Sequence, residues 1–147
     1  MDIRLQYLPY PTSNLCMNIL ITNFHPFDGG GHTTYILSLA RENSQSNGIN
    51  ITIATPRTSK LFAKSVELAI PVVALEFPGK LKELASIGRN VAKLRKILLN
   101  DRYDIVHVNG SPDHRLLVYT LWTMNRRDRP KIVFTKHNSL LVKKTFI

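Results

Sequence analysis

The sequence is poor in cysteine and has no long apolar run. Its single cysteine, Cys16, excludes a disulfide within the chain and favours a reducing compartment. No apolar stretch approaches the roughly 18 residues that would suggest a membrane-spanning helix. The N-terminus also lacks the basic segment and following apolar segment of a secretion signal. We therefore expect a cytoplasmic protein.

Several motifs that carry chemistry are also missing. The histidines do not show the spacing of a metal site, and only one cysteine is present, so we expect no bound metal. Ser111 follows a glycine, but the G-x-S-x-G pattern of a nucleophile elbow is absent. No Gly-Lys-Ser/Thr follows the glycines, which argues against a P-loop. His107 lies inside a predicted strand, where we interpret it as a buried, hydrogen-bonded histidine.

Length, composition and charge indicate one globular domain with a basic surface. The chain has 147 residues, of which 44% are hydrophobic and 20% charged. Its net charge of +10 attracts phosphates, nucleic acid or an anionic membrane surface. Aromatic residues make up 8% and show no stacking pattern with basic residues, so we do not predict nucleic-acid binding.

Apolar segments of strand and helix character alternate along the chain. Residues 1–16 show neither the helical nor the strand periodicity of apolar residues. We expect them to be a disordered or mis-assigned extension before a domain at 17–147. The predicted strands are 17–24, 49–55, 72–77, 104–109 and 131–137, and the predicted helices are 33–43, 59–69, 80–100 and 113–124. This alternation predicts a Rossmann-like three-layer α/β sandwich with a mostly parallel sheet. Ligands in such sheets bind beyond the carboxyl ends of the strands.

A glycine triplet follows the first predicted strand. Gly29, Gly30 and Gly31 allow a tight turn and a close backbone approach, and His32 comes next, at the start of a helix. The unpaired N–H groups of a helix N-terminus favour an anion, so we predict a phosphate or pyrophosphate guest. A simple turn that needs positive φ is the alternative reading.

Dinucleotide binding fits this loop poorly. Gly29 and Gly31 match the first two glycines of G-x-G-x-x-G, but Thr34 occupies the third position. The second predicted strand ends in Ala54-Thr55-Pro56-Arg57, without the acidic residue that holds a ribose. A small nucleotide-dependent oxidoreductase therefore remains only an alternative.

The predicted helix at 80–100 has an apolar and a basic side. The apolar stripe consists of Leu84, Ile87, Val91, Leu94 and Leu98, at steps of three and four residues. The opposite side carries Lys82, Arg89, Lys93 and Lys96. The basic side is either an ordinary solvated surface or a membrane-facing surface that contacts anionic lipid headgroups.

Three segments together resemble glycosyltransferase family 4, whose members have the GT-B fold. They are MNILITNFHPFDGGGHTTYILSLA from Met17, DIVHVNGSPDH from Asp104 and KIVFTKHNS from Lys131. The resemblance implies two facing Rossmann-like domains, with the nucleotide-sugar donor held by the C-terminal one and the acceptor site shaped by the N-terminal one. It also implies transfer with retention of configuration and without a metal or other cofactor.

The resemblance assigns roles to particular residues. Gly29, Gly30, Gly31 and His32 would lie at the donor pyrophosphate, and His137 would be the catalytic residue against the transferred sugar. The acceptor side would be formed by Asn109, Ser111 and Asp113.

The family's donor domain has no counterpart in this sequence, and Ile147 lies only ten residues after His137. We therefore expect an N-terminal acceptor-side domain, truncated at its C-terminal end and inactive without a donor domain. Its substrates would be a nucleotide-sugar and a glycan or lipid-linked acceptor, in polysaccharide or cell-envelope synthesis. It would lie in the cytoplasm or peripherally on the inner face of the membrane. A non-catalytic module that binds phosphate-bearing or lipid-linked ligands is the main alternative.

Overall fold

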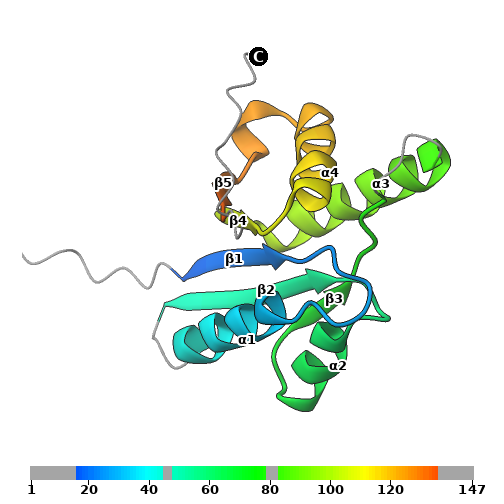
Figure 1. The fold of residues 1–147 in the computed structure, drawn as a ribbon. Coiled ribbons are helices and arrows are strands. Elements are labelled where there is room, and N and C mark those ends of the chain that lie inside the picture. The colour runs from blue at the N-terminus through cyan, green and yellow to red at the C-terminus, as the bar shows by residue number, and fades with distance from the viewer. Residues whose placement is uncertain (1–15, 45–47, 79–82, 136–147) are drawn as a thin grey trace, which may run out of the picture.

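The computed structural model describes residues 16–44, 48–78 and 83–135 (Figure 1). Within these ranges, the five strands form one sheet in the order β3-β2-β1-β4-β5, and every neighbouring pair is parallel. The strands are β1 Met17–Thr22, β2 Ile49–Thr55, β3 Val72–Ala74, β4 Ile105–Val108 and β5 Lys131–Phe134. The helices are α1 Gly31–Ser44, α2 Lys60–Glu67, α3 Leu84–Asp101 and α4 Ser111–Trp122, with a 3-10 turn η2 at Arg126–Asp128. The predicted Rossmann-like α/β fold is confirmed.

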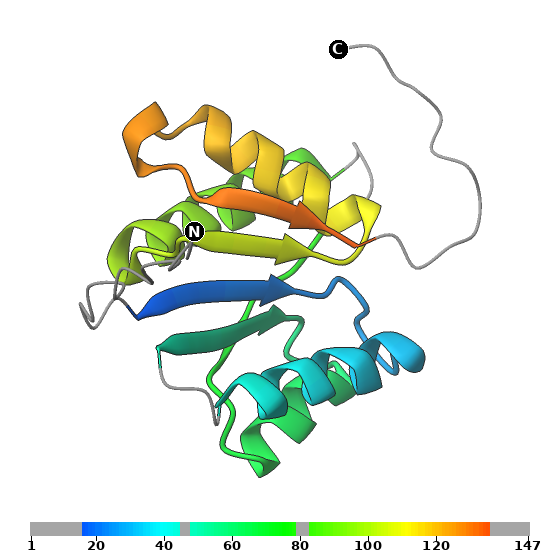
Figure 2. The same ribbon diagram turned by 90° about the vertical axis from the view of Figure 1, so that its left-hand side faces the viewer.

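The sheet lies between two helical layers. Helices α1 and α2 cover one face and helices α3 and α4 cover the other (Figures 1 and 2). The sequence of the central strand β1 is mostly apolar because helices cover both of its faces. Leu20 packs in the core under α3 and α4, while Ile21 packs in the core under α1 and α2, and neither is exposed to solvent.

The strands end where their hydrogen-bonded pairing ends, and this is not always where the apolar segment of the sequence ends. Strand β2 has the predicted bounds, but β1 ends at Thr22, and β3 ends at Ala74 where its pairing with Thr55 ends. Strand β5 is described to Phe134, and the remainder of its predicted range from 136 lies outside the described residues. The predicted extension 1–16 likewise lies outside them, except for Cys16.

Helix α3 corrects one part of the predicted apolar stripe. Leu94 and Leu98 are buried as predicted, but Leu84 is 69% exposed. Figure 1 shows the reason, since the first turn of α3 extends beyond the sheet. On the other side of the helix Arg89, Lys93 and Lys96 are exposed, whereas Lys82 lies outside the described residues. Within the described ranges, no helix has the length and apolar character needed to cross a bilayer.

Candidate functional site

The candidate site lies at the carboxyl edge of the sheet. Because all the strands are parallel, the loops after β1 and β4 leave the same edge, where α1 and α4 begin (Figure 2). The two loops are bonded directly, because the Asn109 amide Nδ2 donates to the Thr22 carbonyl at 2.9 Å. The glycine triplet, in the loop after β1, therefore lies at the carboxyl edge of the sheet, the edge at which ligands bind to parallel sheets of this kind.

A buried carboxylate holds these loops together. Asp113, in the first turn of α4, is fully buried, and its Oδ2 accepts hydrogen bonds from the Thr22 hydroxyl at 2.6 Å and the Asn109 N–H at 2.9 Å. Its Oδ1 accepts from the His114 N–H at 3.2 Å. Burial raises the pKa of Asp113, and its hydrogen bonds from Thr22 and from backbone N–H groups only partly offset this rise. Asp113 thus fixes the end of β1 to the start of α4.

The three residues that the family resemblance placed near the acceptor differ in their exposure to solvent. Asn109 is 2% exposed and Asp113 is 0% exposed, and both side chains are bonded inside the protein, so their geometry suits positioning of the loop. Ser111, at the start of α4, is exposed at the same edge. Thr22 was not identified from sequence, because a threonine inside an apolar strand carries no signal of a partner 91 residues away.

The glycine triplet forms the turn into α1. Gly30 has φ of +52°, in the left-handed region, while Gly31 is the first residue of the helix. The Gly30 N–H donates to Asp28 Oδ1 at 2.9 Å, so one loop amide is occupied by the protein's own side chain. Among the described residues, the Gly31 N–H has no hydrogen-bond partner, as is usual for the first turn of a helix.

Asp28 also connects the loop to α2. Its Oδ2 forms an ion pair with Lys60 Nζ at 2.9 Å. The Lys60 hydrogen bond, followed by the one from the Gly30 N–H, lowers the pKa of Asp28 below its ordinary value. Two further bonds join the same segments, from the Lys60 N–H to the Phe27 carbonyl at 2.9 Å and from the Thr58 hydroxyl to the Pro26 carbonyl at 2.7 Å. Sequence reasoning missed Lys60, because only the fold brings α2 to this loop.

Two buried polar atoms lie against the inner side of the loop. Asn23 and Thr33 are 0% and 5% exposed, and among the described residues neither Asn23 Nδ2 nor Thr33 Oγ1 has a hydrogen-bond partner. A Cβ on Gly29 would lie 3.5 Å from Asn23 Nδ2 and 3.0 Å from Thr33 Oγ1. Native proteins rarely leave buried polar groups unpaired, so these two atoms are potential hydrogen-bond donors beside the loop.

Histidines and an aromatic ring border the same loop. The His25 ring lies 4.1 Å from that of Phe24 and meets His32 edge-on at 4.8 Å between ring centroids. His32 follows Gly31 in the first turn of α1. His107 is 8% exposed and its Nε2 lies 2.6 Å from Thr135 Oγ1, which confirms the prediction of a buried, bonded histidine. His137 lies outside the described residues.

The end of β2 offers no acidic group to a ribose. The Thr55 hydroxyl lies 3.0 Å from Ser59 Oγ, and Pro56 and Arg57 follow. The dinucleotide fingerprint therefore remains incomplete in the fold, as in the sequence. In the part of the chain that the structure describes, no three His, Cys, Asp or Glu side chains gather as metal ligands.

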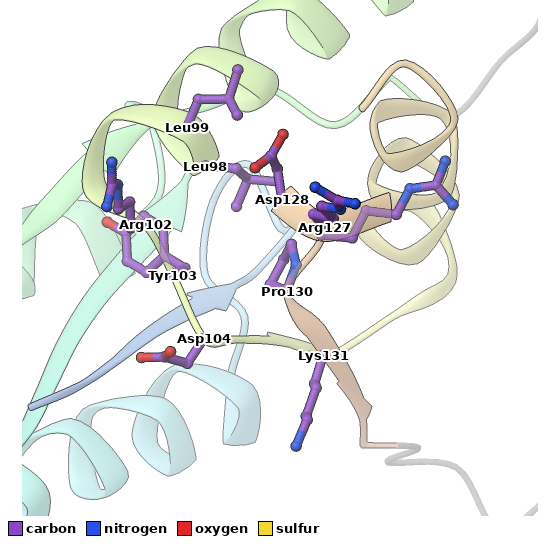
Figure 3. Close-up of a pocket in the computed structure, with 10 residues that line it drawn as sticks. Leu98, Leu99, Arg102, Tyr103, Asp104, Arg127, Asp128, Pro130 and Lys131 are labelled. Atoms are coloured by element: carbon purple, nitrogen blue, oxygen red, sulfur yellow. The ribbon is translucent and has the colours of Figure 1, made fainter. Parts of the chain in front are cut away.

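A separate pocket lies at the opposite edge, where β4 and β5 begin (Figure 3). Its volume is about 600 Å³, and its basic lining residues are Arg102, Arg127, Arg129 and Lys131. The Arg129 guanidinium donates to the Met124 carbonyl and the Asp104 carboxylate accepts from the Asn18 N–H, so both serve the fold. Because this pocket lies at the amino ends of the strands, it is distinct from the glycine-loop site.

The fold and the site define a class of protein, the Rossmann-like α/β domains with a glycine-rich turn between the first strand and the first helix. The sequence matches the model of Glycosyltransferase Family 4 over residues 29–146. The structure of Acinetobacter baumannii MurG is similar, with a TM-score of 0.60 and 13% identity, over 85% of this chain and 36% of that chain. The C-terminal domain of a Pyrococcus furiosus hydrogenase has a TM-score of 0.49 and 16% identity, over 86% of this chain and 95% of that chain. No curated protein matches.

The chain belongs to glycosyltransferase family 4, since the family model covers most of its length. Its likeness to MurG supports the predicted GT-B type of Rossmann-like domain. The chain spans 36% of the length of MurG, so it corresponds to one part of that structure.

Proposed function

We propose that this chain is the acceptor-side domain of a retaining glycosyltransferase. It would help transfer a sugar from a nucleotide-sugar to a glycan or lipid-linked acceptor, together with a donor domain on the same or another chain. The observation that carries this proposal is the glycine loop of a family 4 domain at the carboxyl edge of its sheet. A place in polysaccharide or cell-envelope synthesis, at the cytoplasmic side of the membrane, is part of the proposal.

The chemistry follows from the charge of the leaving group. When the sugar leaves its donor, negative charge develops on the diphosphate, and fixed donors that are already aimed at it lower the barrier. The Gly31 N–H and the positive end of the α1 dipole supply such donors from this chain. The other donors would come from the donor domain, which is why we expect little transfer without it.

The remaining site residues have proposed roles on the acceptor side. Ser111 is exposed at the edge and would contact the acceptor, while Asn109 and Asp113 would hold Ser111 in place through the loop. His32 would lie beside the pyrophosphate. His137 would lie against the transferred sugar, a role that rests on its resemblance to the family histidine after strand five.

Complementation tests the function. The chain would be mixed with a family 4 donor domain and a radiolabelled nucleotide-sugar, and we expect sugar transfer or donor hydrolysis. No turnover, with phosphate-ligand binding retained, would instead support a non-catalytic binding module.

His137→Ala should lower this turnover by about tenfold or more while leaving the thermal melting curve unchanged.

Gly30→Val should weaken binding of inorganic pyrophosphate by about tenfold. A β-branched residue is strained at φ of +52°, and no atom lies within 4 Å of the new Cβ, so the side chain would enter the space from which a ligand approaches. Titration calorimetry provides the measurement. Gly88→Val is the matched control, because Gly88 lies in α3 and its Cβ also meets open space. Equal affinity in folded Gly30→Val protein would reject the role of this loop.

We further propose that the exposed basic side of α3 contacts anionic lipid. Arg89, Lys93 and Lys96 are exposed on one helix, and each cation near a charged surface adds about 1 kcal/mol to binding. Flotation with vesicles should recover more protein on anionic than on neutral lipid. Replacing the three by glutamine should remove the difference. Equal recovery of the wild type with both lipids would reject this contact.

A further inference from the structure

We propose that the Lys60 ammonium and the Gly30 amide form an anion-binding pair that the Asp28 carboxylate occupies until a phosphate-bearing ligand displaces it. Asp28 is then an internal competitor, and Lys60 is a ligand-binding residue contributed by α2. The inference rests on the proposed function, since it concerns how the same glycine loop receives a diphosphate.

The geometry of Asp28 resembles that of a bound phosphate. One carboxylate oxygen accepts from the Gly30 N–H at 2.9 Å, and the other meets Lys60 Nζ at 2.9 Å. Two oxygens of a phosphate can take the same two donors, and a charged acceptor binds both strongly. The Lys60 and Asp28 side chains are 53% and 57% exposed, so an anion from solvent can reach this pair without opening the core.

Lys60 is held beside the loop by contacts that do not involve Asp28. The Lys60 N–H donates to the Phe27 carbonyl, and the Thr58 hydroxyl donates to the Pro26 carbonyl. These bonds keep the start of α2 against the loop when the Asp28 side chain turns away. Lys60 therefore stays near the loop, where its ammonium can meet an incoming anion.

The inner side of the loop supplies an independent sign of a ligand. Asn23 Nδ2 and Thr33 Oγ1 are buried, have no hydrogen-bond partner among the described residues, and face Gly29, the neighbour of Asp28. Both atoms can donate to a phosphate oxygen. The conformation in which Asp28 occupies the pair leaves these donors unsatisfied, so a shift of the loop around a diphosphate would give them partners.

Charge explains why the ligand would be a diphosphate and not a weaker anion. An aspartate is ionised at neutral pH, and the hydrogen bonds from Lys60 and the Gly30 N–H lower the pKa of Asp28 further, so the incoming anion must outcompete a carboxylate. A singly charged anion gains little by this exchange, whereas a diphosphate brings more charge and more acceptor oxygens. Asp28 would thus make the loop selective for multiply charged ligands.

Calorimetric titration of inorganic pyrophosphate into three variants of the full chain tests the inference. Asp28→Asn keeps an oxygen for the Gly30 N–H but removes the charge, and it should bind pyrophosphate about fivefold more tightly than the wild type. Lys60→Gln should bind about fivefold more weakly. Lys64→Gln, on the same helix and with its own ion pair to Glu67 at 2.8 Å, should match the wild type.

Two results would overturn the inference. One is unchanged or weaker binding by folded Asp28→Asn protein, and the other is equal loss of affinity in the Lys60 and Lys64 variants. Either result leaves the proposed function intact, because that function is judged by sugar transfer in the complementation assay. The converse result, predicted pyrophosphate affinities without any transfer, would support the anion pair and reject the transferase role.

Discussion

Asp113→Ala should lower the free energy of unfolding by about 2–4 kcal/mol. The substitution removes a fully buried side chain that accepts hydrogen bonds from the Thr22 hydroxyl and the Asn109 N–H. Both donors lie inside the protein and would lose a partner, and an unsatisfied buried group costs about 1–3 kcal/mol. Urea unfolding followed by circular dichroism provides the measurement. A loss below about 0.5 kcal/mol would mean that Asp113 does not hold the two loops together.

Asp113→Asn separates the shape of this side chain from its charge. Asparagine keeps the volume and one acceptor oxygen, so its loss of stability should be smaller than that of alanine. Burial raises the pKa of Asp113 in the folded protein, so its contribution to stability is complete below the unfolded pKa and is lost as pH rises through the folded pKa. The wild type should therefore gain stability relative to Asp113→Asn as pH falls from 7 towards 4. A gain in the opposite direction would contradict the raised pKa.

Local patterns predicted the elements that depend on local chemistry. The β-branched run of β2 gave the observed bounds, Ile49–Thr55, because its pairing with β1 extends over nearly the whole apolar segment. The glycine triplet correctly indicated a turn into a helix at the carboxyl edge. The exposed position of Leu84 was not predicted, because helical periodicity shows which residues share a face but not where the sheet beneath that face ends.

The contacts that build the site could not be read from the sequence. Asp28 and Lys60 are 32 residues apart, and Thr22 and Asp113 are 91 residues apart. Each pair meets only because β1 lies between β2 and β4 in the sheet. The family resemblance placed Asp113 near the acceptor, at the edge where it lies. The fold uses its side chain as a buried acceptor of hydrogen bonds from the Thr22 hydroxyl and the Asn109 N–H.

Gly110→Ala should also destabilise the protein, by about 1–3 kcal/mol, through crowding at the same edge. Gly110 has φ of −165° and ψ of 177°, an extended conformation that any residue can adopt, so the requirement for glycine is one of space. A Cβ at this position would overlap Cε1 of Phe24 and lie 2.6 Å from Cδ1 of the same ring. Phe24 packs against the core under α3 and α4 and stacks on His25, so its displacement would disturb both the core and the glycine loop.

A double-mutant cycle with Phe24→Ala distinguishes crowding from a general intolerance of side chains at residue 110. If the ring is the obstacle, adding Gly110→Ala to Phe24→Ala should cost less than about 0.5 kcal/mol, which gives a coupling free energy of about 0.5–3 kcal/mol. Gly88→Ala serves as the control, and it should be neutral or stabilising because alanine favours a helix and its Cβ meets open space. Equal costs of Gly110→Ala with and without the Phe24 ring would show that the β4 loop needs glycine for another reason. The cycle thus tests whether the Phe24 ring is what excludes a side chain from residue 110, directly before the start of α4 at Ser111.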